Sequence, residues 1–299
     1  MSEFRTVGLI GRRGDPRVAP TLLQLWRILR EFDREVIVEH HAPGLEDCGA
    51  DVIRSPRETM AARCDLLVVV GGDGTLLSAA RAGSAWGVPI LGVNQGRLGF
   101  MVDVAPGEVR ETLNAVFAGD YLREQRLLLQ ARLRRDNADT ASFLAINDVV
   151  IRNQAAIRMI EFETWLDDEF ISQHRADGFI VSSPTGSTAY ALSGGGPVLH
   201  PSLEAMALVP ICPHTLSDRP IVVGARQTVR IVLRGNVTTQ ATFTCDGQNS
   251  MSLRAGEALE VGAAESRLHL IHPKNYSYFN ILRDKLHWGR GPRLNPDST

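Results

Sequence analysis

Lysine is almost absent from this chain, and arginine supplies nearly all of its positive charge. Lys274 and Lys285 are the only lysines, although the 299 residues include 32 lysines and arginines together. A Walker-type phosphate loop needs a lysine directly after its glycines, so this class of nucleotide site is excluded. The formal net charge of -2 argues against a broad surface for nucleic acid or membrane lipid.

Cysteine is also sparse. Cys48, Cys64, Cys212 and Cys245 are scattered without the spacing of metal ligands, which is typical of reduced thiols. The eight histidines lack a His-Glu-x-x-His spacing, so we predict no dedicated metal site in the protein. No apolar run approaches bilayer length and no charged-then-apolar leader opens the sequence, and we therefore expect a cytoplasmic protein.

The length allows two domains, and the first 120 residues have the pattern of an α/β domain. Apolar strands alternate there with amphipathic helices, which predicts parallel βαβ units and a doubly wound sheet. A capping-box pattern at Ser55-Pro56-Arg57-Glu58 indicates that one short helix starts there. The strands are expected at Thr6–Ile10, Glu35–Glu39, Leu66–Val70 and Val88–Val93, and the longer helices at Pro20–Phe32 and Pro106–Ala118.

The pattern changes after Asp120, where short β-like runs replace the alternation of strands and helices. Many short strands with polar turns predict a β-rich, sandwich-like domain over residues 121–275. A last amphipathic helix is expected at Tyr276–His287, and we expect residues 276–299 to return to the first domain. The β-like runs are Leu127–Arg134, Phe143–Ile151, Met159–Leu166, Phe179–Ser182, Val229–Leu233 and Leu268–Ile271.

The stretch Gly71-Gly72-Asp73-Gly74-Thr75 directly follows the most apolar predicted strand. Glycines let the backbone turn tightly and approach a ligand. Thr75 is predicted to cap the following helix, whose free N–H groups and dipole favour phosphate. A carboxylate at such a turn disfavours an anion unless a metal ion or a hydroxyl group is also bound, so Asp73 is the candidate for chemistry. A tight turn without a ligand is the structural alternative.

A second polar stretch begins at Asp177-Gly178 and runs through Ser183-Pro184-Thr185-Gly186-Ser187-Thr188-Ala189-Tyr190 to Gly194-Gly195-Gly196-Pro197. Small hydroxylated residues and glycines at this density predict a pocket lined by backbone, with many short donors and acceptors. Tyr190 can stack on a base or on nicotinamide. The alternative is a flexible loop between strands. Asp246-Gly247-Gln248 indicates a hairpin turn.

These motifs resemble those of one enzyme family. Gly71–Thr75 resembles the turn shared by NAD kinases, diacylglycerol and sphingosine kinases and, more loosely, phosphofructokinases. The second stretch resembles the second motif of NAD kinases, and Leu98-Gly99-Phe100 resembles a further block. Asn147-Asp148 resembles their Asn-Glu pair, with Asp148 one methylene shorter than the usual glutamate. Residues 213–220 and 272–279 resemble bacterial members.

The resemblance implies an enzyme that transfers the γ-phosphoryl group of ATP, bound with Mg²⁺, to the 2′-hydroxyl of the adenosine ribose of NAD. Asp73 would act as base or orient the hydroxyl, and the protein would form homodimers or homotetramers. A lipid or sphingoid kinase and a non-enzymatic NAD-binding regulator remain as alternatives. The residues expected to bind substrate are Gly71, Gly72, Asp73, Gly74, Thr75, Phe100, Asn147, Asp148, Arg158, Arg175, Asp177, Thr185, Thr188, Ala189, Tyr190, Ser193 and Gln248.

Overall fold

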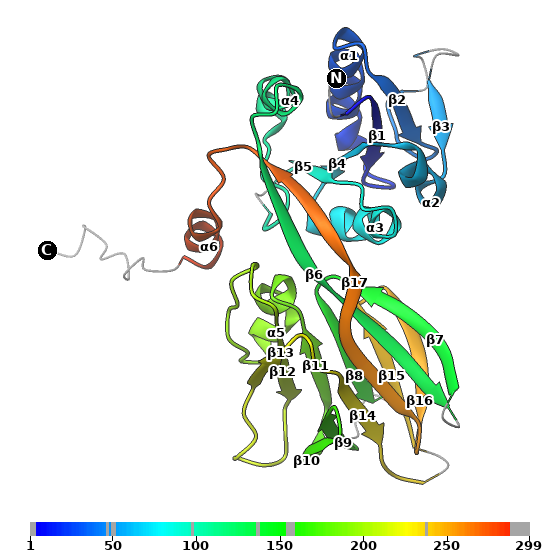
Figure 1. The fold of residues 1–299 in the computed structure, drawn as a ribbon, viewed down its shortest axis with the longest axis vertical. Helices are drawn as coiled ribbons and strands as arrows, with labels where there is room; N and C mark the ends of the chain where they lie inside the picture. Colours follow the sequence, from blue (N-terminus) through cyan, green and yellow to red (C-terminus); the bar gives the residue numbers. More distant parts are fainter. Residues whose placement is uncertain are drawn as a thin grey trace, which may run out of the picture. The chain divides into compact units, whose positions relative to one another are not determined.

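The computed structural model describes residues 4–45, 48, 52–96, 99–135, 138–153, 159–236 and 239–287. The chain forms two compact units. One combines Met1–Glu124 with His269–Thr299, and the other is Gln125–Leu268. The chain therefore leaves the first unit in strand β6 and re-enters it in strand β17 (Figure 1).

The first unit is built on a parallel sheet with the strand order β5-β4-β1-β2-β3. All six residues of β4 are buried, as expected for an apolar strand covered on both faces. The end of β17 extends this sheet, because Leu270 and Ile271 pair in parallel with Ile90 and Leu91 of β5. The strands are β1 (Thr6–Gly11), β2 (Glu35–Glu39), β3 (Ile53–Ser55), β4 (Leu66–Gly71) and β5 (Ile90–Asn94).

Helices cover both faces of this sheet, which makes it doubly wound. Buried residues of α1 and α4 share one apolar cluster with Leu9, Val68 and Val70. The opposite face carries α3, where Leu67 lies close to Gly83. The helices are η1 (Pro16–Val18), α1 (Ala19–Glu31), α2 (Arg57–Met60), η3 (Ala61–Arg63), α3 (Asp73–Ser84), η4 (Pro106–Glu108), α4 (Val109–Phe117) and α6 (Tyr278–Leu286).

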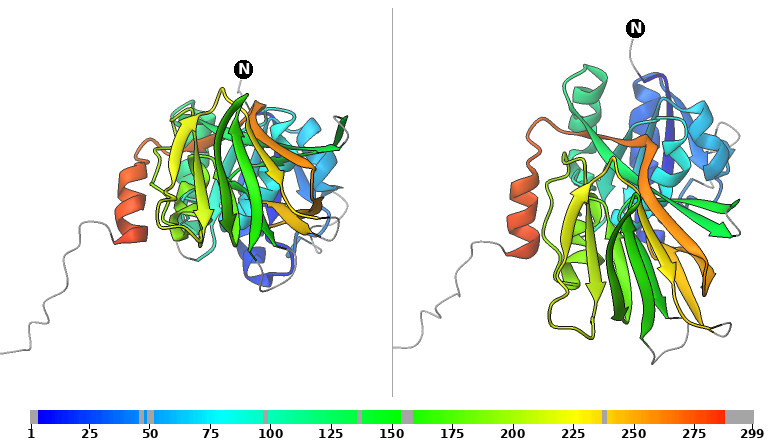
Figure 2. Two further views of the ribbon diagram at one scale, coloured as in Figure 1. Left: turned by 90° about the horizontal axis from the view of Figure 1, so that it is seen from below. Right: turned by 60° about the horizontal axis from the view of Figure 1, so that its bottom comes forward.

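The second unit contains two groups of antiparallel strands (Figures 1 and 2). A six-stranded sheet has the order β13-β12-β11-β8-β15-β16. The other group has the order β10-β9-β14-β17, with β6 paired to β17 and β7 paired to β6. The strands are β6 (Leu122–Arg135), β7 (Ala138–Ala145), β8 (Asp148–Asn153), β9 (Ile160–Leu166), β10 (Glu169–Ala176), β11 (Gly178–Ser182), β12 (Ala205–Ile211), β13 (Ile221–Gly224), β14 (Val229–Leu233), β15 (Gln240–Cys245), β16 (Asn249–Arg254) and β17 (Ala258–His272).

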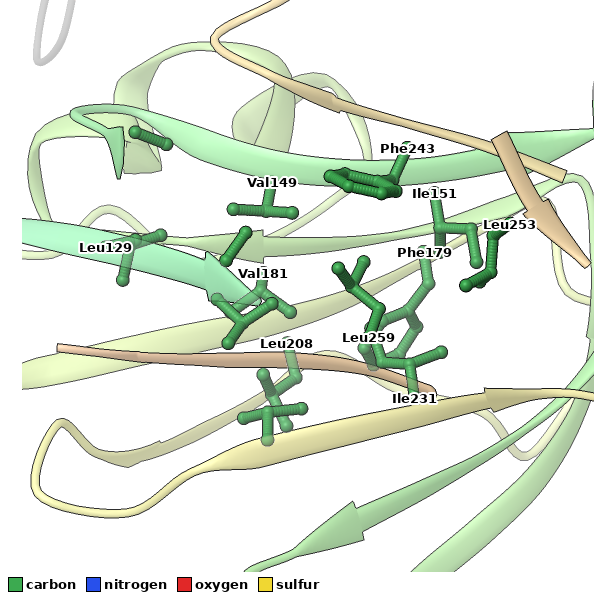
Figure 3. Packing of buried hydrophobic residues seen from close by; sticks show 14 of the residues in the cluster. Leu129, Val149, Ile151, Phe179, Val181, Leu208, Ile231, Phe243, Leu253 and Leu259 are labelled. Carbon is green, nitrogen blue, oxygen red and sulfur yellow. The ribbon is translucent and has the colours of Figure 1, made fainter. Parts of the chain in front are cut away.

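The core of the second unit lies between these two groups of strands. Phe179 and Phe243 from the six-stranded sheet face Ile231 and Leu259 from the other group, and all four are almost fully buried (Figure 3). The helical turns η5 (Thr185–Thr188) and α5 (Tyr190–Ser193) follow β11. Ala191 packs on the outer face of the six-stranded sheet, in a separate apolar cluster.

The predicted fold class is confirmed: a doubly wound α/β unit, a β-sandwich-like unit, and a C-terminal helix, α6, that belongs to the first unit. The short helix expected at Ser55–Glu58 is confirmed, since α2 begins at Arg57, but the prediction that Ser55 forms a capping box is wrong. Ser55 is the last residue of β3 and pairs with Glu39, so Pro56 occupies the N-cap position of α2 without a side-chain bond.

The predicted strand Phe143–Ile151 is two strands, β7 and β8, with a break at Ile146–Asn147. The predicted run Leu268–Ile271 is only the end of the fifteen-residue strand β17. Five strands of the second unit were not predicted: β10, β15 and β16, which carry many polar residues, and the apolar strands β12 and β13.

Candidate functional site

The glycine turn joins the end of β4 to the start of α3. Gly72 is the N-cap residue in an extended conformation, and α3 begins at Asp73. The prediction that Thr75 caps this helix is wrong, because the cap position makes no side-chain hydrogen bond and Thr75 lies inside the first turn. Thr75 packs instead under Gly71, where a Cβ atom would lie 2.6 Å from Thr75 Oγ1. Gly71 is therefore required by packing.

The other two glycines of the turn leave space. A Cβ atom at Gly72 or Gly74 would meet no heavy atom of the described residues within 4 Å. The first N–H groups of a helix lack intrahelical acceptors, and the helix dipole makes that end favourable for anions. Open space above such an end suits a bound phosphate group.

Asp73 is held by the segment that follows β5. Its Oδ2 accepts a hydrogen bond from the backbone N–H of Phe100 (2.9 Å), and its Oδ1 accepts one from that of Met101 (3.0 Å). Gly99 makes this approach possible, because a Cβ there would lie 2.2 Å from Asp73 Oδ1. Each carboxylate oxygen keeps acceptor capacity for a further hydrogen bond. Asp73 can therefore accept a hydroxyl proton while its orientation stays fixed.

Asn94 lies beside this turn and was not among the predicted site residues. It pairs with Gly71 in the sheet, and its side chain is buried. Its Nδ2 donates to the carbonyl of Gly96 (3.0 Å), whereas its Oδ1 has no hydrogen-bond partner among the described residues. An asparagine at the end of a strand next to a glycine turn is the sequence feature that could have identified it.

A second polar group forms in the other unit, around Asn147 and Asp148. The carboxylate of Asp246 accepts the backbone N–H groups of Ile146, Asn147 and Asp148. On the opposite side, the backbone N–H of Ser183 donates to the carbonyl of Asn147 (2.9 Å). Asp246 was predicted only as part of a turn, and nothing in the sequence links it to residues 146–148.

Asp148, the first residue of β8, is 5% exposed. Burial, and secondarily the negative charge of Asp246, raise the pKa of Asp148 to about 7. Both causes disfavour the charged form. Near neutral pH this side chain therefore offers a proton donor as well as an acceptor.

The turn η5 packs directly against Asn147. A Cβ at Gly186 would lie 2.1 Å from the carbonyl oxygen of Asn147, so only glycine fits there. Thr185 Oγ1 is buried without a hydrogen-bond partner in the described part of the chain, and Thr188 Oγ1 donates to the carbonyl of Thr185 (3.4 Å). The structure thus brings Asn147, Asp148, Thr185 and Thr188 together.

The remaining predicted residues of the second unit lie nearer the surface. Tyr190 is 47% exposed on α5, and Ser193 at the end of α5 is exposed, while Ala189 is half-buried before it. Arg158 lies outside the described residues. Three further predicted residues are also exposed: Arg175 near the end of β10, Asp177 directly after that strand, and Gln248 in the hairpin turn after Asp246.

Over the residues that the structure describes, no group of three or more His, Cys, Asp or Glu side chains is placed to hold a metal ion. None of the helices in the described ranges is both long and apolar enough to span a bilayer.

Comparison with known proteins gives consistent matches along the chain. Residues 7–121 match the model of the ATP-NAD kinase N-terminal domain, and residues 146–273 match that of the ATP-NAD kinase C-terminal domain. An NAD kinase of Teredinibacter turnerae is 46% identical over 289 residues, covering 96% of this chain and 98% of that protein. An NAD kinase of Pseudomonas entomophila is 44% identical over 295 residues, with 97% of each chain covered.

Two solved structures are similar in fold. The yeast NADH kinase, crystallised with NADH, superposes with a TM-score of 0.89 at 23% identity and covers 98% of this chain and 93% of its own. An NAD kinase from Archaeoglobus fulgidus in complex with ATP gives a TM-score of 0.73 at 26% identity, covering 94% of this chain and 98% of its own.

Proposed function

The chain belongs to the ATP-NAD kinase family, and on that premise we propose that it transfers the γ-phosphoryl group of ATP to the 2′-hydroxyl of the adenosine ribose of NAD, giving NADP and ADP. NAD kinase activity follows from the family. The proposal adds the donor, the acceptor atom and the residues that act. Relatives support the two substrates, since the solved structures hold NADH in one case and ATP in the other.

The observation that carries the proposal is the fixed carboxylate of Asp73. Two backbone N–H groups orient it at the start of α3, and its remaining lone pairs are available to a sugar hydroxyl. Phosphoryl transfer has a loose transition state, so positioning and charge stabilisation supply most of the acceleration. Asp73 would orient the hydroxyl and accept its proton late in the transfer.

The glycine turn would hold the donor phosphates. The open space at Gly72 and Gly74 lies at the anion-favouring end of α3. Because Asp73 alone would repel a polyphosphate, we propose that ATP binds as its Mg²⁺ complex, in which the metal ion neutralises phosphate oxygens. Gly71, Thr75 and Phe100 would shape this part of the site.

The dinucleotide would be held by the polar group of the second unit. Asn147 and Asp148 would hydrogen-bond adenine or ribose, and the buried hydroxyl of Thr185 is unpaired within the described residues and so offers a further donor. The other proposed contacts are Arg158, Arg175, Asp177, Thr188, Ala189, Tyr190, Ser193 and Gln248.

The test measures NADP formation with Mg²⁺, ATP and NAD through an NADP-specific dehydrogenase. Asp73→Asn is expected to lower the rate by roughly 10²–10⁴-fold, the usual contribution of a positioned acid–base group. Asp65→Asn is the matched control, because Asp65 also accepts two backbone N–H groups, those of Arg5 and Thr6, within the same unit. If Asp73→Asn keeps its activity, the proposed role of Asp73 in orienting and deprotonating the hydroxyl is contradicted. If the wild-type protein forms no NADP, the proposed function is contradicted.

Two other measurements separate the alternatives raised by the glycine turn. A lipid or sphingoid kinase would phosphorylate diacylglycerol or sphingosine with labelled ATP, and the family assignment argues against it. A non-enzymatic NAD-binding regulator would bind NAD equally well with Asn at position 73.

We also propose a cytoplasmic homodimer or homotetramer, with residues 1–120 and 276–299 in one domain and 121–275 in the NAD-binding domain. Light scattering coupled to size-exclusion chromatography gives the assembly state directly.

A further inference from the structure

The hairpin turn between β15 and β16 carries a carboxylate that binds a distant segment of the chain. Asp246 Oδ1 accepts the backbone N–H groups of Ile146 (3.0 Å), Asn147 (2.7 Å) and Asp148 (3.3 Å), and Oδ2 also accepts that of Ile146 (3.1 Å). In return, the backbone N–H of Asp246 donates to the carbonyl of Asp148 (3.0 Å). One side chain thus binds three successive amides.

The first two of these amides form the break between β7 and β8, and the third belongs to Asp148, the first residue of β8. A backbone N–H that is buried without an acceptor is costly, and an interrupted strand loses its ladder partners. Asp246 supplies the missing acceptors, while Ser183 and Gly186 enclose the carbonyl of Asn147 from the other side. The backbone of Asn147 is therefore fixed through both of its polar groups.

The backbone conformation of Asp246 is suited to this role. Asp246 has φ +52° and Gly247 has φ +64°, left-handed values that Asp and Gly tolerate better than other residues. This conformation lets the turn present a side chain to residues 146–148 while β15 and β16 continue their pairing up to Cys245 and Asn249.

We propose that Asp246 is a positioning residue for the dinucleotide, acting through Asn147 and Asp148. It fixes the direction in which these two side chains leave the backbone. They can then contact NAD without a further loss of conformational entropy on binding. This inference rests on the proposed function, because Asn147 and Asp148 are taken to contact NAD. Asp246 has no assigned contact with the substrate.

A second aspartate of the same unit provides a matched control. Asp167 lies in the hairpin turn between β9 and β10 with φ +52°, and its Oδ1 accepts the backbone N–H of Thr228 (2.9 Å). The backbone N–H of Asp167 donates back to the carbonyl of Thr228 (2.8 Å). The two aspartates therefore share their turn conformation and their type of hydrogen bond, but Asp167 holds no residue proposed to bind NAD.

The experiment compares Asp246→Ala with Asp167→Ala. We expect Asp246→Ala to raise KM for NAD about tenfold or more while kcat and KM for ATP change by less than about threefold, since a tenfold change in binding corresponds to loss of about one hydrogen bond to a charged group. Asp246→Asn, whose amide oxygen still accepts, is expected to restore most of the affinity. Asp167→Ala is expected to change stability only.

Amide hydrogen exchange tests the hydrogen bonds between Asp246 and these backbone N–H groups independently of enzyme activity. Exchange at Ile146, Asn147 and Asp148 is expected to accelerate in Asp246→Ala and to stay unchanged in Asp167→Ala. If Asp246→Ala proves too unstable, Asp246→Ser is used in its place. Because its hydroxyl is a weaker acceptor than the carboxylate, we expect the same changes in amide exchange and in KM for NAD, but smaller ones.

The possible outcomes distinguish this inference from the proposed function. The positioning role is overturned if the wild-type enzyme is active and Asp246→Ala changes KM for NAD no more than Asp167→Ala does. It is also overturned if amide exchange at Ile146, Asn147 and Asp148 does not change in Asp246→Ala. Absence of NADP formation by the wild type overturns the proposed function, and with it the positioning role, even if the amides respond.

Discussion

Replacing Gly99 by alanine should disable Asp73 by displacing its carboxylate, although the Asp73 side chain itself is unchanged. A Cβ at Gly99 would lie 2.2 Å from Asp73 Oδ1 and 2.4 Å from Val102 Cγ2, whereas ordinary contacts begin at 3.4 Å. To reach 3.4 Å, the contact with Asp73 Oδ1 must lengthen by about 1.2 Å and that with Val102 Cγ2 by about 1.0 Å. Asp73 is tied to the backbone of Phe100 and Met101, so movement of either side changes where the carboxylate lies.

The size of the effect follows from that displacement. A misplacement of about 1 Å in a catalytic group costs roughly 100-fold in rate, or about 2.7 kcal/mol in the activation barrier. We therefore expect Gly99→Ala to lower kcat for NADP formation about 100-fold in the coupled assay. Stability should fall by about 1–3 kcal/mol, the usual cost of an inserted methyl group in a packed site, which circular dichroism during urea unfolding measures.

Gly107→Ala is the control, because a Cβ at Gly107 meets no described atom within 4 Å. It should leave both rate and stability nearly unchanged. If Gly99→Ala is folded and retains kcat within about threefold of the wild type, the argument that the precise position of Asp73 matters is refuted.

Two further predictions concern ionisable groups. The pKa of Asp148 is raised to about 7 in the folded protein, whereas in the unfolded chain this group loses its proton near pH 4. Between these two values the folded state binds the extra proton, so the contribution of Asp148 to stability is lost as pH rises from about 4 to about 7. Asp148→Asn should therefore raise the melting temperature at pH 8 and leave it unchanged at pH 4, and an equal shift at both values would contradict this. Glu39 is fully buried and pairs with buried Arg57 (2.8 Å) and with Arg13. Glu39→Ala should therefore lower the free energy of unfolding, measured with urea, by about 3–5 kcal/mol, because it leaves the buried charge of Arg57 unpaired. The exposed pair of Glu31 and Arg110 supplies the control, since Glu31→Ala should leave the urea midpoint unchanged.

Patterns of apolar residues were sufficient to predict the α/β unit. The predicted positions lie close to those of the buried strands β1, β2 and β4 and of the helices α1 and α4. A strand buried on both faces gives an unbroken apolar run, and a helix buried along one stripe gives a periodic one, so both are easy to find in the sequence. Strand β15 was missed although it carries the alternation of a half-buried strand, with Ala241, Phe243 and Cys245 buried between polar residues. Strand β16 gives little signal, because Leu253 is its only buried residue.

The candidate site was only partly predictable for a related reason. The glycine turn and Asp73 are local in sequence, so their spacing was visible. The acceptors that orient the site are not local: Phe100 is 27 residues from Asp73, and Asp246 lies 98 residues from Asp148. The mistaken cap at Thr75 has the same origin, since local propensity does not include the packing of Thr75 under Gly71.

The return of the chain through β17 has a consequence for synthesis on the ribosome. The partner of β5 in the parallel sheet is contributed by Leu270 and Ile271, which are translated long after Ile90 and Leu91. Until they emerge, the nascent polypeptide carries an open edge at β5, and such edges invite pairing with other chains. The parallel sheet of the first unit is thus completed only by residues that are synthesised after the whole second unit, Gln125–Leu268.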